Sequence, residues 1–468
     1  MTATLAVNPA PVSNGIAPAS AGGVSLFPNL NNGTAPTPTT TGAPTKAITA
    51  QTQALDAAEL EKLHNAIIAG NIPQLVTGAM TYAVGLRSSD IHIEPERNTV
   101  RIRLRIDGVL RQIVEYPTNI HPAVVSRIKI MSNLKIDEQR IPQDGRAQVT
   151  TPQGEELDLR VSTLPTVNGE KVVMRIQERT REIPPLEKLG LVGRGLEALK
   201  KSLELPNGII LTTGPTGSGK TTTLYSSLQI LNKINVNILT FEDPVEIQMD
   251  GLNQSQMHPD IEYNFARGLR AALRQDPDIM MVGEIRDRET IDVAIESSLT
   301  GHLVLSTIHT NNAVETLTRI LNMGVPPFLM TATINIIIAQ RLVRKLCEHC
   351  RKPATIDDVT ALLVKKALDR LSPQEKIDPA LLAKPTFYEA VGCDQCDHIG
   401  YHGRLGLYEV LEMNNEIRLL LLKGANSLEI ETAAIKNGMT TLEQSGILKA
   451  LHGETTLSEV YRVARPME

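Results

Sequence analysis

The chain has 468 residues, enough for two to four domains that each bury a core of their own. Apolar residues make up 41% and charged residues 21%, which is ordinary for a globular protein, and the net charge of −5 argues against a general basic surface for nucleic acids. Tryptophan is absent and aromatic residues are 3%, which argues against broad surfaces for base stacking.

The sequence also argues against a membrane span or a secretory signal. No apolar run approaches the roughly 20 residues that a bilayer span needs. The first residues lack a basic stretch followed by an apolar one. We therefore expect a cytosolic protein that meets a membrane only through a partner.

The first 52 residues predict a flexible low-complexity tail. They are rich in Ala, Pro, Thr, Gly and Asn, Lys46 is their only charged residue, and no apolar period repeats. A tether or docking peptide is the alternative interpretation. The next stretch, "DAAELEKLHNAII" from Asp56 to Ile68, has the spacing of a helix.

An α+β domain is predicted over residues 53–182. Apolar residues alternate with arginines from Val100 to Ile106, which is typical of a half-buried strand, and Asp107–Gly108 predicts a turn into a second strand. The stretch "ELDLRVSTLPTVNGEKVVMRI" repeats the pattern with Asn168–Gly169 as its turn. A linker is expected at 183–191, because the two prolines of "EIPPLEKLG" cannot continue a helix or a sheet ladder.

The rest of the chain changes to an order of strand, loop and helix. "GIILTTG", "VNILTFED", "DIMMVGE" and "HLVLSTIH" are short apolar strands, each followed by a segment of helix length. This alternation predicts a parallel sheet covered by helices over 192–345. A cysteine-rich subdomain with a charged helical insert is expected at 346–399, and a helical subdomain at 400–468.

The stretch "GPTGSGKT" predicts a nucleotide site. It fits G-x-x-x-x-G-K-[ST] in full and lies between a strand and a helix, where backbone N–H groups can surround phosphates. Lys220 would reach the outer phosphates, and the Thr221 hydroxyl would bind magnesium. The predicted cofactor-binding residues are Gly214, Pro215, Thr216, Gly217, Ser218, Gly219, Lys220, Thr221 and Thr222. ATP or GTP binding follows.

Two C-x-x-C pairs predict a structural zinc site. The candidate ligands are Cys347, Cys350, Cys393 and Cys396. Four thiolates suit tetrahedral zinc, and no ligand position is left open for catalysis. A redox pair and unused thiols are the alternatives. His349 and His398 lie nearby in the sequence but are expected outside the ligand set.

The motifs together resemble one family. "SSDIHIEPERNTVRIRLRIDGVLR", "GPTGSGKTTTLY", "EDPVE", "LRQDPDIMMVGEIRD", "STIHTN" and "GCDQCDHIGYHGRLGLYEV" occur in the same order as in the secretion ATPases that drive type II secretion and assemble type IV pili. The resemblance runs from about residue 70 to the end. It implies a RecA-like P-loop ATPase core, an N-terminal PAS-like α+β domain, a tetracysteine zinc subdomain and a helical C-terminal tail.

The resemblance implies roles for two carboxylates and a histidine. Glu242 would orient the attacking water and Glu284 would lie on the magnesium side, so that Gly283 needs no acid. His309 would sense the phosphate. The alternatives are a helix-capping acid for Glu242, a salt bridge to Arg286 for Glu284, and a hydrogen-bonded core histidine.

The resemblance also implies a ring. Arg160 and Arg175 would reach the γ-phosphate when the N-terminal domain closes on the nucleotide, with the linker as hinge. The expected interface or sensor residues are Arg270, Arg274, Arg286 and Arg404. Solvated arginines in weak ion pairs are the alternative for each. Six subunits would convert sequential closures into movement of a central partner.

The expected function is a hexameric ATPase that powers type II secretion by pseudopilus assembly at the cytoplasmic face of the inner membrane. Its cofactors would be ATP, Mg²⁺ and Zn²⁺, and its partners inner-membrane platform proteins. Pilus assembly is the alternative, whereas the retraction branch of the family usually lacks the cysteine segment. Family members usually carry a further N-terminal docking domain, where this sequence has the tail and one short helix. A RecA-like nucleic-acid motor and a nucleotide switch with little turnover are the alternatives from other classes.

Overall fold

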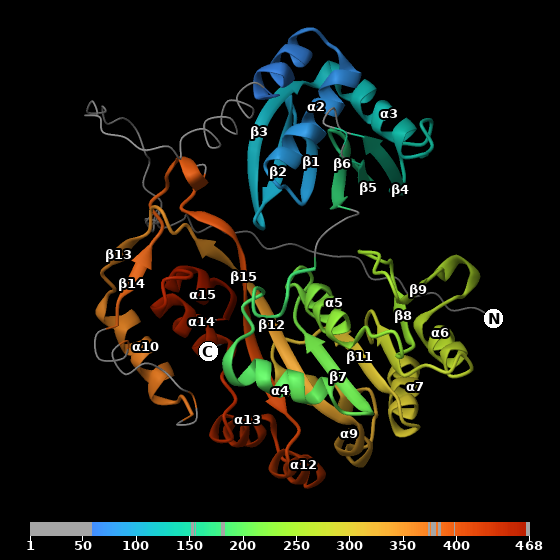
Figure 1. Ribbon diagram of the computed structural model, residues 1–468. Coiled ribbons are helices and arrows are strands. Elements are labelled where there is room, and N and C mark those ends of the chain that lie inside the picture. Colours follow the sequence, from blue (N-terminus) through green and yellow to red (C-terminus); the bar gives the residue numbers. More distant parts are fainter. Residues whose placement is uncertain are drawn as a thin grey trace, which may run out of the picture. The chain divides into compact units, whose positions relative to one another are not determined.

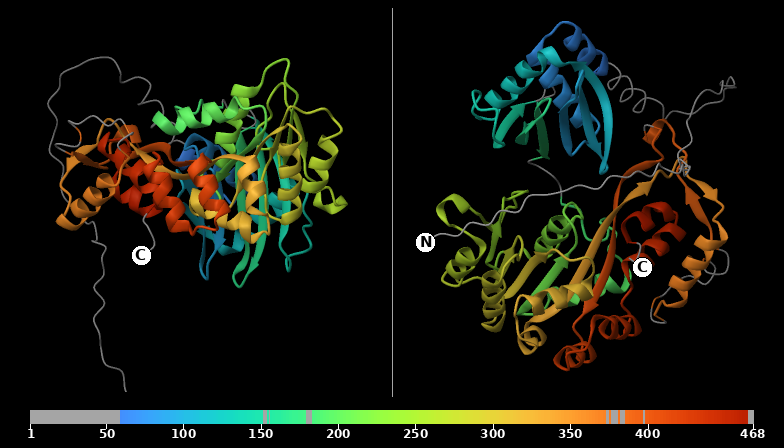
Figure 2. Two further views of the ribbon diagram at one scale, coloured as in Figure 1. Left: turned by 90° about the horizontal axis from the view of Figure 1, so that it is seen from below. Right: turned by 180° about the vertical axis from the view of Figure 1, so that it is seen from behind.

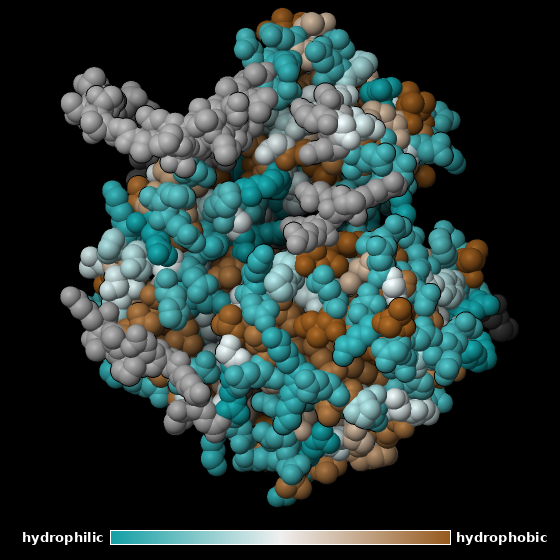
Figure 3. Space-filling model, in the orientation of Figure 1, coloured by the Kyte–Doolittle hydropathy of each residue, from teal (hydrophilic) through white to brown (hydrophobic). Residues whose placement is uncertain are grey.

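The computed structural model describes residues 59–150, 154, 156–178, 183–372, 375, 381, 385–396 and 398–464. The predicted tail at 1–52 lies outside these residues. Residues 59–68 are helical, as the spacing of the sequence predicts. No helix of the described residues is both long and apolar enough to cross a membrane. The face seen in Figure 3 is mostly hydrophilic, with several separate apolar patches.

The N-terminal domain is an antiparallel sheet of six strands in the order β3-β2-β1-β6-β5-β4, with α2 and α3 on one face (Figure 1). Its elements are α2 (Ile72–Gly85), β1 (Asp90–Pro95), β2 (Thr99–Ile106), β3 (Val109–Pro117), η1 (Thr118–Ile120), α3 (His121–Met131), β4 (Gln143–Thr150), β5 (Glu156–Thr166) and β6 (Gly169–Glu178). The alternation along β2 is confirmed, because Val100, Ile102 and Leu104 are buried while the arginines between them are not.

The sheet face opposite the apolar one carries a row of charged residues. Register places Arg105, Asp90, Arg175, Arg160 and Arg146 side by side on β2, β1, β6, β5 and β4. Asp90 is buried, and its carboxylate accepts from Nε of Arg175 at 2.9 Å. Arg105 Nε lies 3.5 Å from the other oxygen of Asp90. One carboxylate thus holds the arginines on both sides of it.

The C-terminal part of the chain, described from residue 183 onward, contains a seven-stranded sheet in the order β15-β12-β7-β11-β10-β8-β9, with helices on both faces (Figure 2). In chain order, the elements from α4 to the sixth strand of this sheet are α4 (Gly193–Leu203), β7 (Gly208–Thr213), α5 (Lys220–Leu231), β8 (Ile238–Glu242), β9 (Asn253–Gln256), η2 (Pro259–Ile261), α6 (Phe265–Ala272), β10 (Ile279–Val282), α7 (Arg288–Leu299), β11 (Leu303–Ile308), α8 (Ala313–Asn322), α9 (Pro327–Thr333) and β12 (Ile334–Leu346). All neighbouring strands from β12 to β9 are parallel. The central strand β7 is buried along its whole length, which explains its continuous apolar sequence.

The remaining elements surround the cysteines and complete the C-terminal end. They are β13 (Lys352–Ala354), α10 (Asp358–Asp369), β14 (Phe387–Glu389), η3 (Asp394–Cys396), β15 (Tyr401–Glu412), α12 (Asn415–Leu422), α13 (Ser427–Lys436), α14 (Leu442–Leu451) and α15 (Leu457–Ala464). The sequence prediction grouped residues 400–468 as helical. The structure instead adds β15 to the seven-stranded sheet, antiparallel to β12, before the four helices begin.

Glu409 on β15 connects the C-terminal helices to the seven-stranded sheet. Its carboxylate accepts from the backbone N–H of Ala313 at 2.7 Å and of Leu442 at 3.3 Å, the first residues of α8 and α14. Burial raises the pKa of Glu409 to about 7, although both backbone hydrogen bonds oppose this shift. One buried side chain therefore caps two helices.

The predicted linker at 183–191 is packed against the C-terminal part of the chain from Pro184 onward. Leu186 is fully buried in a cluster that includes Leu199 and Tyr225. The Ser226 hydroxyl on α5 donates to the Pro184 carbonyl at 2.7 Å. From Pro184 onward this segment is therefore packed as part of the C-terminal part.

Candidate nucleotide and metal sites

The predicted phosphate-binding loop joins the end of β7 to the start of α5. Gly214, Gly217 and Gly219 have φ values of 148°, 77° and 88°, a region that favours glycine. A Cβ at Gly214 would lie 2.5 Å from the Gln340 carbonyl, so the loop start also has no room for a side chain. The Ser218 hydroxyl is buried with no hydrogen-bond partner in the described residues. Such an unsatisfied donor in a glycine cradle fits a phosphate group.

Lys220, Thr221 and Thr222 begin α5 at the phosphate loop, and Pro215 and Thr216 are exposed in the loop itself. Lys220 Nζ donates to the carbonyls of Gly214 at 2.7 Å and Pro215 at 3.1 Å. Burial lowers the pKa of Lys220 to about 8, while the charge of Glu284 acts in the opposite direction. A phosphate would replace these carbonyls as the partner of the ammonium group and restore its usual pKa.

Glu284 and His309 meet beside this loop. Glu284 follows β10, His309 follows β11, and His309 Nε2 lies 3.3 Å from Glu284 Oε2. The other Glu284 oxygen contacts the Arg286 guanidinium, so the expected salt bridge exists as well. Thr221 is exposed on α5, and together with Glu284 it offers the hard oxygen ligands that Mg²⁺ prefers.

Gly283 is a glycine because the neighbouring strand occupies the space of a side chain. Its N–H donates to the Phe241 carbonyl at 2.7 Å. A Cβ there would lie 3.2 Å from the same carbonyl oxygen and 3.5 Å from the Glu242 Cα. An acidic side chain at this position would push β10 away from β8.

Glu242 ends β8 and is almost fully buried, with 2% of its surface exposed. Its carboxylate accepts from the hydroxyl of Thr240 at 2.6 Å, from the amide of Gln254 at 3.1 Å and from the hydroxyl of Tyr225. Burial raises its pKa, and these hydrogen bonds oppose the shift. The group is thus held rigidly at the strand end where ligands bind in such sheets.

The His309 loop is fastened to the strand that precedes the phosphate loop. The Thr310 N–H donates to the Thr213 hydroxyl at 2.9 Å, and the hydroxyls of the two threonines are 2.6 Å apart. Thr310 also contacts the Thr316 hydroxyl on α8 at 2.7 Å. Movement of either loop is therefore passed to the other.

The predicted arginines fall into separate groups. Arg160 and Arg175 are partners in register on the N-terminal sheet, where Arg160 Nε donates to Gln177 at 3.2 Å. Arg270 on α6 pairs with Glu289 at 2.7 Å, and Arg274 donates to the Arg270 carbonyl at 3.0 Å; both are exposed.

Arg404 is exposed on β15, opposite Arg344. Among the predicted arginines, the structure brings only Arg286 into contact with a predicted catalytic residue, Glu284.

Sequence reasoning missed three residues around this site. Arg341 and Gln340 come from β12, next to β7, and Tyr225 comes from α5. Gln340 accepts from the Thr223 hydroxyl at 2.9 Å, beneath the start of the same helix. Their nearness depends on the strand order and on the packing of α5, and no local sequence signal indicates it.

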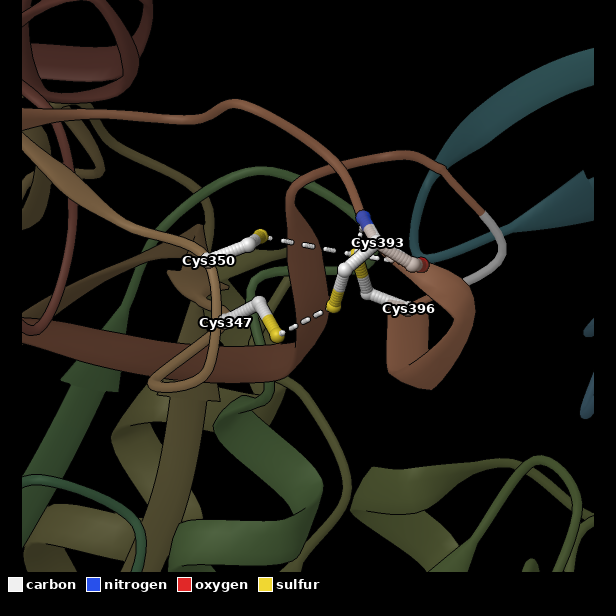
Figure 4. A group of neighbouring side chains, drawn as sticks. All are labelled: Cys347, Cys350, Cys393 and Cys396. Carbon is white, nitrogen blue, oxygen red and sulfur yellow. Dashed lines mark hydrogen bonds between the residues drawn. The ribbon is translucent and has the colours of Figure 1, made fainter. Parts of the chain in front are cut away.

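The four cysteines form a single cluster (Figure 4). Sγ of Cys347 lies 3.8 Å from Sγ of Cys393, and Cys396 Sγ lies 3.8 Å from both Cys350 and Cys393. A tetrahedral zinc ion with bonds of about 2.3 Å spaces its sulfur ligands about 3.8 Å apart. A disulfide needs about 2.0 Å, and all four are free cysteines.

Backbone donors support thiolate ligands in this cluster. Gly400 N–H points to Cys396 Sγ at 3.1 Å and Gly392 N–H to Cys350 Sγ at 3.3 Å. His398 instead faces Asp394 at 3.4 Å and is exposed. The residues present therefore fit a closed four-sulfur zinc site.

The parallel sheet, the phosphate loop at its carboxyl edge and the Glu284–His309 pair define a P-loop ATPase with a RecA-like core. Comparison with known proteins identifies the family. The family described as Type II/IV secretion system protein matches residues 66–462. The chain belongs to this family and is a secretion or pilus-assembly ATPase.

Two curated relatives are similar over most of the chain. "Type IV pilus assembly ATPase PilB" of Myxococcus xanthus is 48% identical over 389 residues, 83% of this chain and 67% of that protein. "Type II secretion system protein E" of Xanthomonas campestris pv. campestris is 48% identical over 417 residues, 89% of this chain and 71% of that protein. A solved structure, "Crystal Structure of the Pilus Retraction Motor PilT and Bound ADP", is 26% identical with a TM-score of 0.54, and covers 83% of this chain and 97% of that one.

Proposed function

We propose that this chain is the hexameric ATPase of a type II secretion machine, which hydrolyses ATP at the cytoplasmic face of the inner membrane. The observation that carries the proposal is the phosphate loop, in which Lys220 Nζ is held by two loop carbonyls and the Ser218 hydroxyl has no hydrogen-bond partner among the described residues. Both would bind the phosphates of ATP. Thr221 and Glu284 would hold magnesium, which supplies charge neutralisation on the outer phosphates.

In this proposal, residues at the ends of two strands have different roles in hydrolysis. Glu242 orients the attacking water, because it is fixed by three hydrogen bonds at the end of β8. His309, within contact distance of Glu284, senses the terminal phosphate. Arg160 and Arg175 approach the γ-phosphate when the N-terminal domain closes. Arg270, Arg274, Arg286 and Arg404 serve the subunit interface of the ring.

The four cysteines would hold zinc as a structural ion, and inner-membrane platform proteins would be the partners. Pilus assembly is the second candidate, since a relative named for it is 48% identical, the same identity as the relative named for type II secretion. The two candidate functions are distinguished by purifying the tagged chain from membranes of the cells that naturally produce it. The bound proteins are then identified by mass spectrometry. A platform protein of a secretion machine supports the proposal, and one of a pilus machine replaces it with the second candidate.

The ATPase itself is tested with the zinc-loaded full chain and the Lys220→Ala variant. We expect ATP hydrolysis that needs Mg²⁺, does not need DNA, and is lost in the variant. Particles six times the mass of one 51.0 kDa chain should form with an ATP analogue. Hydrolysis that depends on DNA would show a nucleic-acid motor instead.

A further inference from the structure

Arg341 is a cation beside the phosphate loop that has no role in the function described so far. It lies on β12, two residues after Ala339, which pairs with Thr213 at the end of β7 (Figure 1). A Cβ built on Gly214 would be 3.1 Å from Nη1 of Arg341, so the guanidinium borders the first residue of the loop. Its place depends on the adjacency of two strands far apart in the sequence.

The guanidinium of Arg341 is held only by backbone carbonyls in the described part of the chain. Nη2 donates to the Asn311 carbonyl at 2.7 Å, and Nη1 donates to the Gln340 carbonyl at 3.1 Å. No carboxylate of the described residues forms an ion pair with it, whereas Arg344 on the same strand pairs with Glu459 at 2.7 Å. Arginine carries five N–H donors, so further donors remain for a ligand.

Burial makes this charge costly, which favours an anion as its partner. Arg341 is half-buried, and the removal of water lowers its pKa, although the charges of Glu409 and Glu315 oppose this shift. Its positive charge also contributes to the lowered pKa of Lys220, so the two cations lie near one another. A group with two or more negative charges between them would relieve both.

The surroundings of Arg341 point to the outermost phosphate. The inner phosphates of a nucleotide lie inside the loop, where backbone N–H groups surround them. Arg341 lies outside the loop, on the side of the segment that follows β11, and its bond to Asn311 ties it to the residues next to His309. We infer that Arg341 binds the terminal phosphate of ATP and couples its presence to the His309–Asn311 segment. This inference rests on the proposed ATP site.

The test compares Arg341→Gln and Arg341→Lys with Lys233→Gln, an exposed residue beyond the far end of α5 that matches the change of charge. Full-length, zinc-loaded protein is titrated in Mg²⁺ with fluorescent ADP, and a non-hydrolysable ATP analogue is used as competitor. We expect Arg341→Gln to lose about 10- to 100-fold in affinity for the ATP analogue and less than about threefold for ADP. Lys233→Gln should match the unsubstituted chain.

The affinity of Arg341→Lys for the ATP analogue should lie between those of Arg341→Gln and Lys233→Gln. A lysine keeps the charge but cannot bind the Asn311 carbonyl and a phosphate with one rigid fork. Equal losses for both nucleotides, or no loss for either, would overturn the inference and leave Arg341 as a structural residue. Failure of the unsubstituted chain to bind any nucleotide would instead refute the proposed function.

Discussion

Substitution of Glu409 by glutamine tests whether a buried carboxylate at two helix starts is neutral near pH 7. Burial favours the protonated acid, while two backbone N–H groups and the positive ends of two helix dipoles favour the carboxylate. A pKa of about 7 instead of 4.5 means that burial dominates. Since one pKa unit equals 1.36 kcal/mol, the difference is worth about 3 kcal/mol.

The direction in which stability changes with pH follows from proton binding to Glu409. Between pH 4.5 and 7 the folded protein keeps the proton on Glu409 while the unfolded chain releases it. This group therefore stabilises the fold below about pH 4.5, and its contribution is lost as the pH rises through about 7. Glutamine cannot titrate, so the stability of the variant should lack this dependence on pH.

The assay is thermal unfolding of Glu409→Gln and the unsubstituted chain at the same zinc loading, from pH 5 to pH 8. The variant should become relatively more stable with rising pH, by about 2.5 kcal/mol or roughly 5–10 °C over the range. Comparison at each pH cancels the titration of all other groups. A difference that does not change with pH would refute the reasoning and show that the carboxylate stays ionised between its two helices.

Three further predictions concern the sites. Glu242→Gln should still bind Mg-ATP but lose at least about 100-fold in turnover, measured by phosphate release, because water is no longer oriented; normal turnover would contradict this. Glu284→Gln should raise the Mg²⁺ concentration needed for half-maximal rate and slow turnover, and an unchanged requirement would count against a magnesium-side role. Cys396→Ser should lower bound zinc below one ion per chain in metal analysis and lower the unfolding temperature; full zinc occupancy would contradict the four-sulfur site.

The strands and the phosphate loop were predictable because their signals are local. G-x-x-x-x-G-K-[ST] requires a strand before it and a helix after it, and β7 and α5 lie there. The two C-x-x-C pairs likewise specify a metal site by composition and spacing, and their sulfur atoms do converge. The turn at Asp107–Gly108 has φ values of 47° and 83°, as a tight hairpin turn requires.

What remained unpredicted depends on pairing between distant segments. The apolar run in "INIIIAQRLVRKL" is ambiguous between helix and strand by periodicity, so its place beside β7 does not follow from its sequence. Arg341 was missed for that reason. The hydrogen bond between Tyr225 and Glu242 also depends on the packing of α5 on the sheet, which no local pattern specifies.

The segment that begins at Pro184 is tied to the helix at the phosphate loop. The Pro184 carbonyl accepts from the Ser226 hydroxyl, on the helix whose first residue is Lys220. Tension applied at Pro184 would therefore act on that helix. We expect such tension to alter the position of Lys220, so that mechanical load and nucleotide binding would be linked without a separate sensor of force.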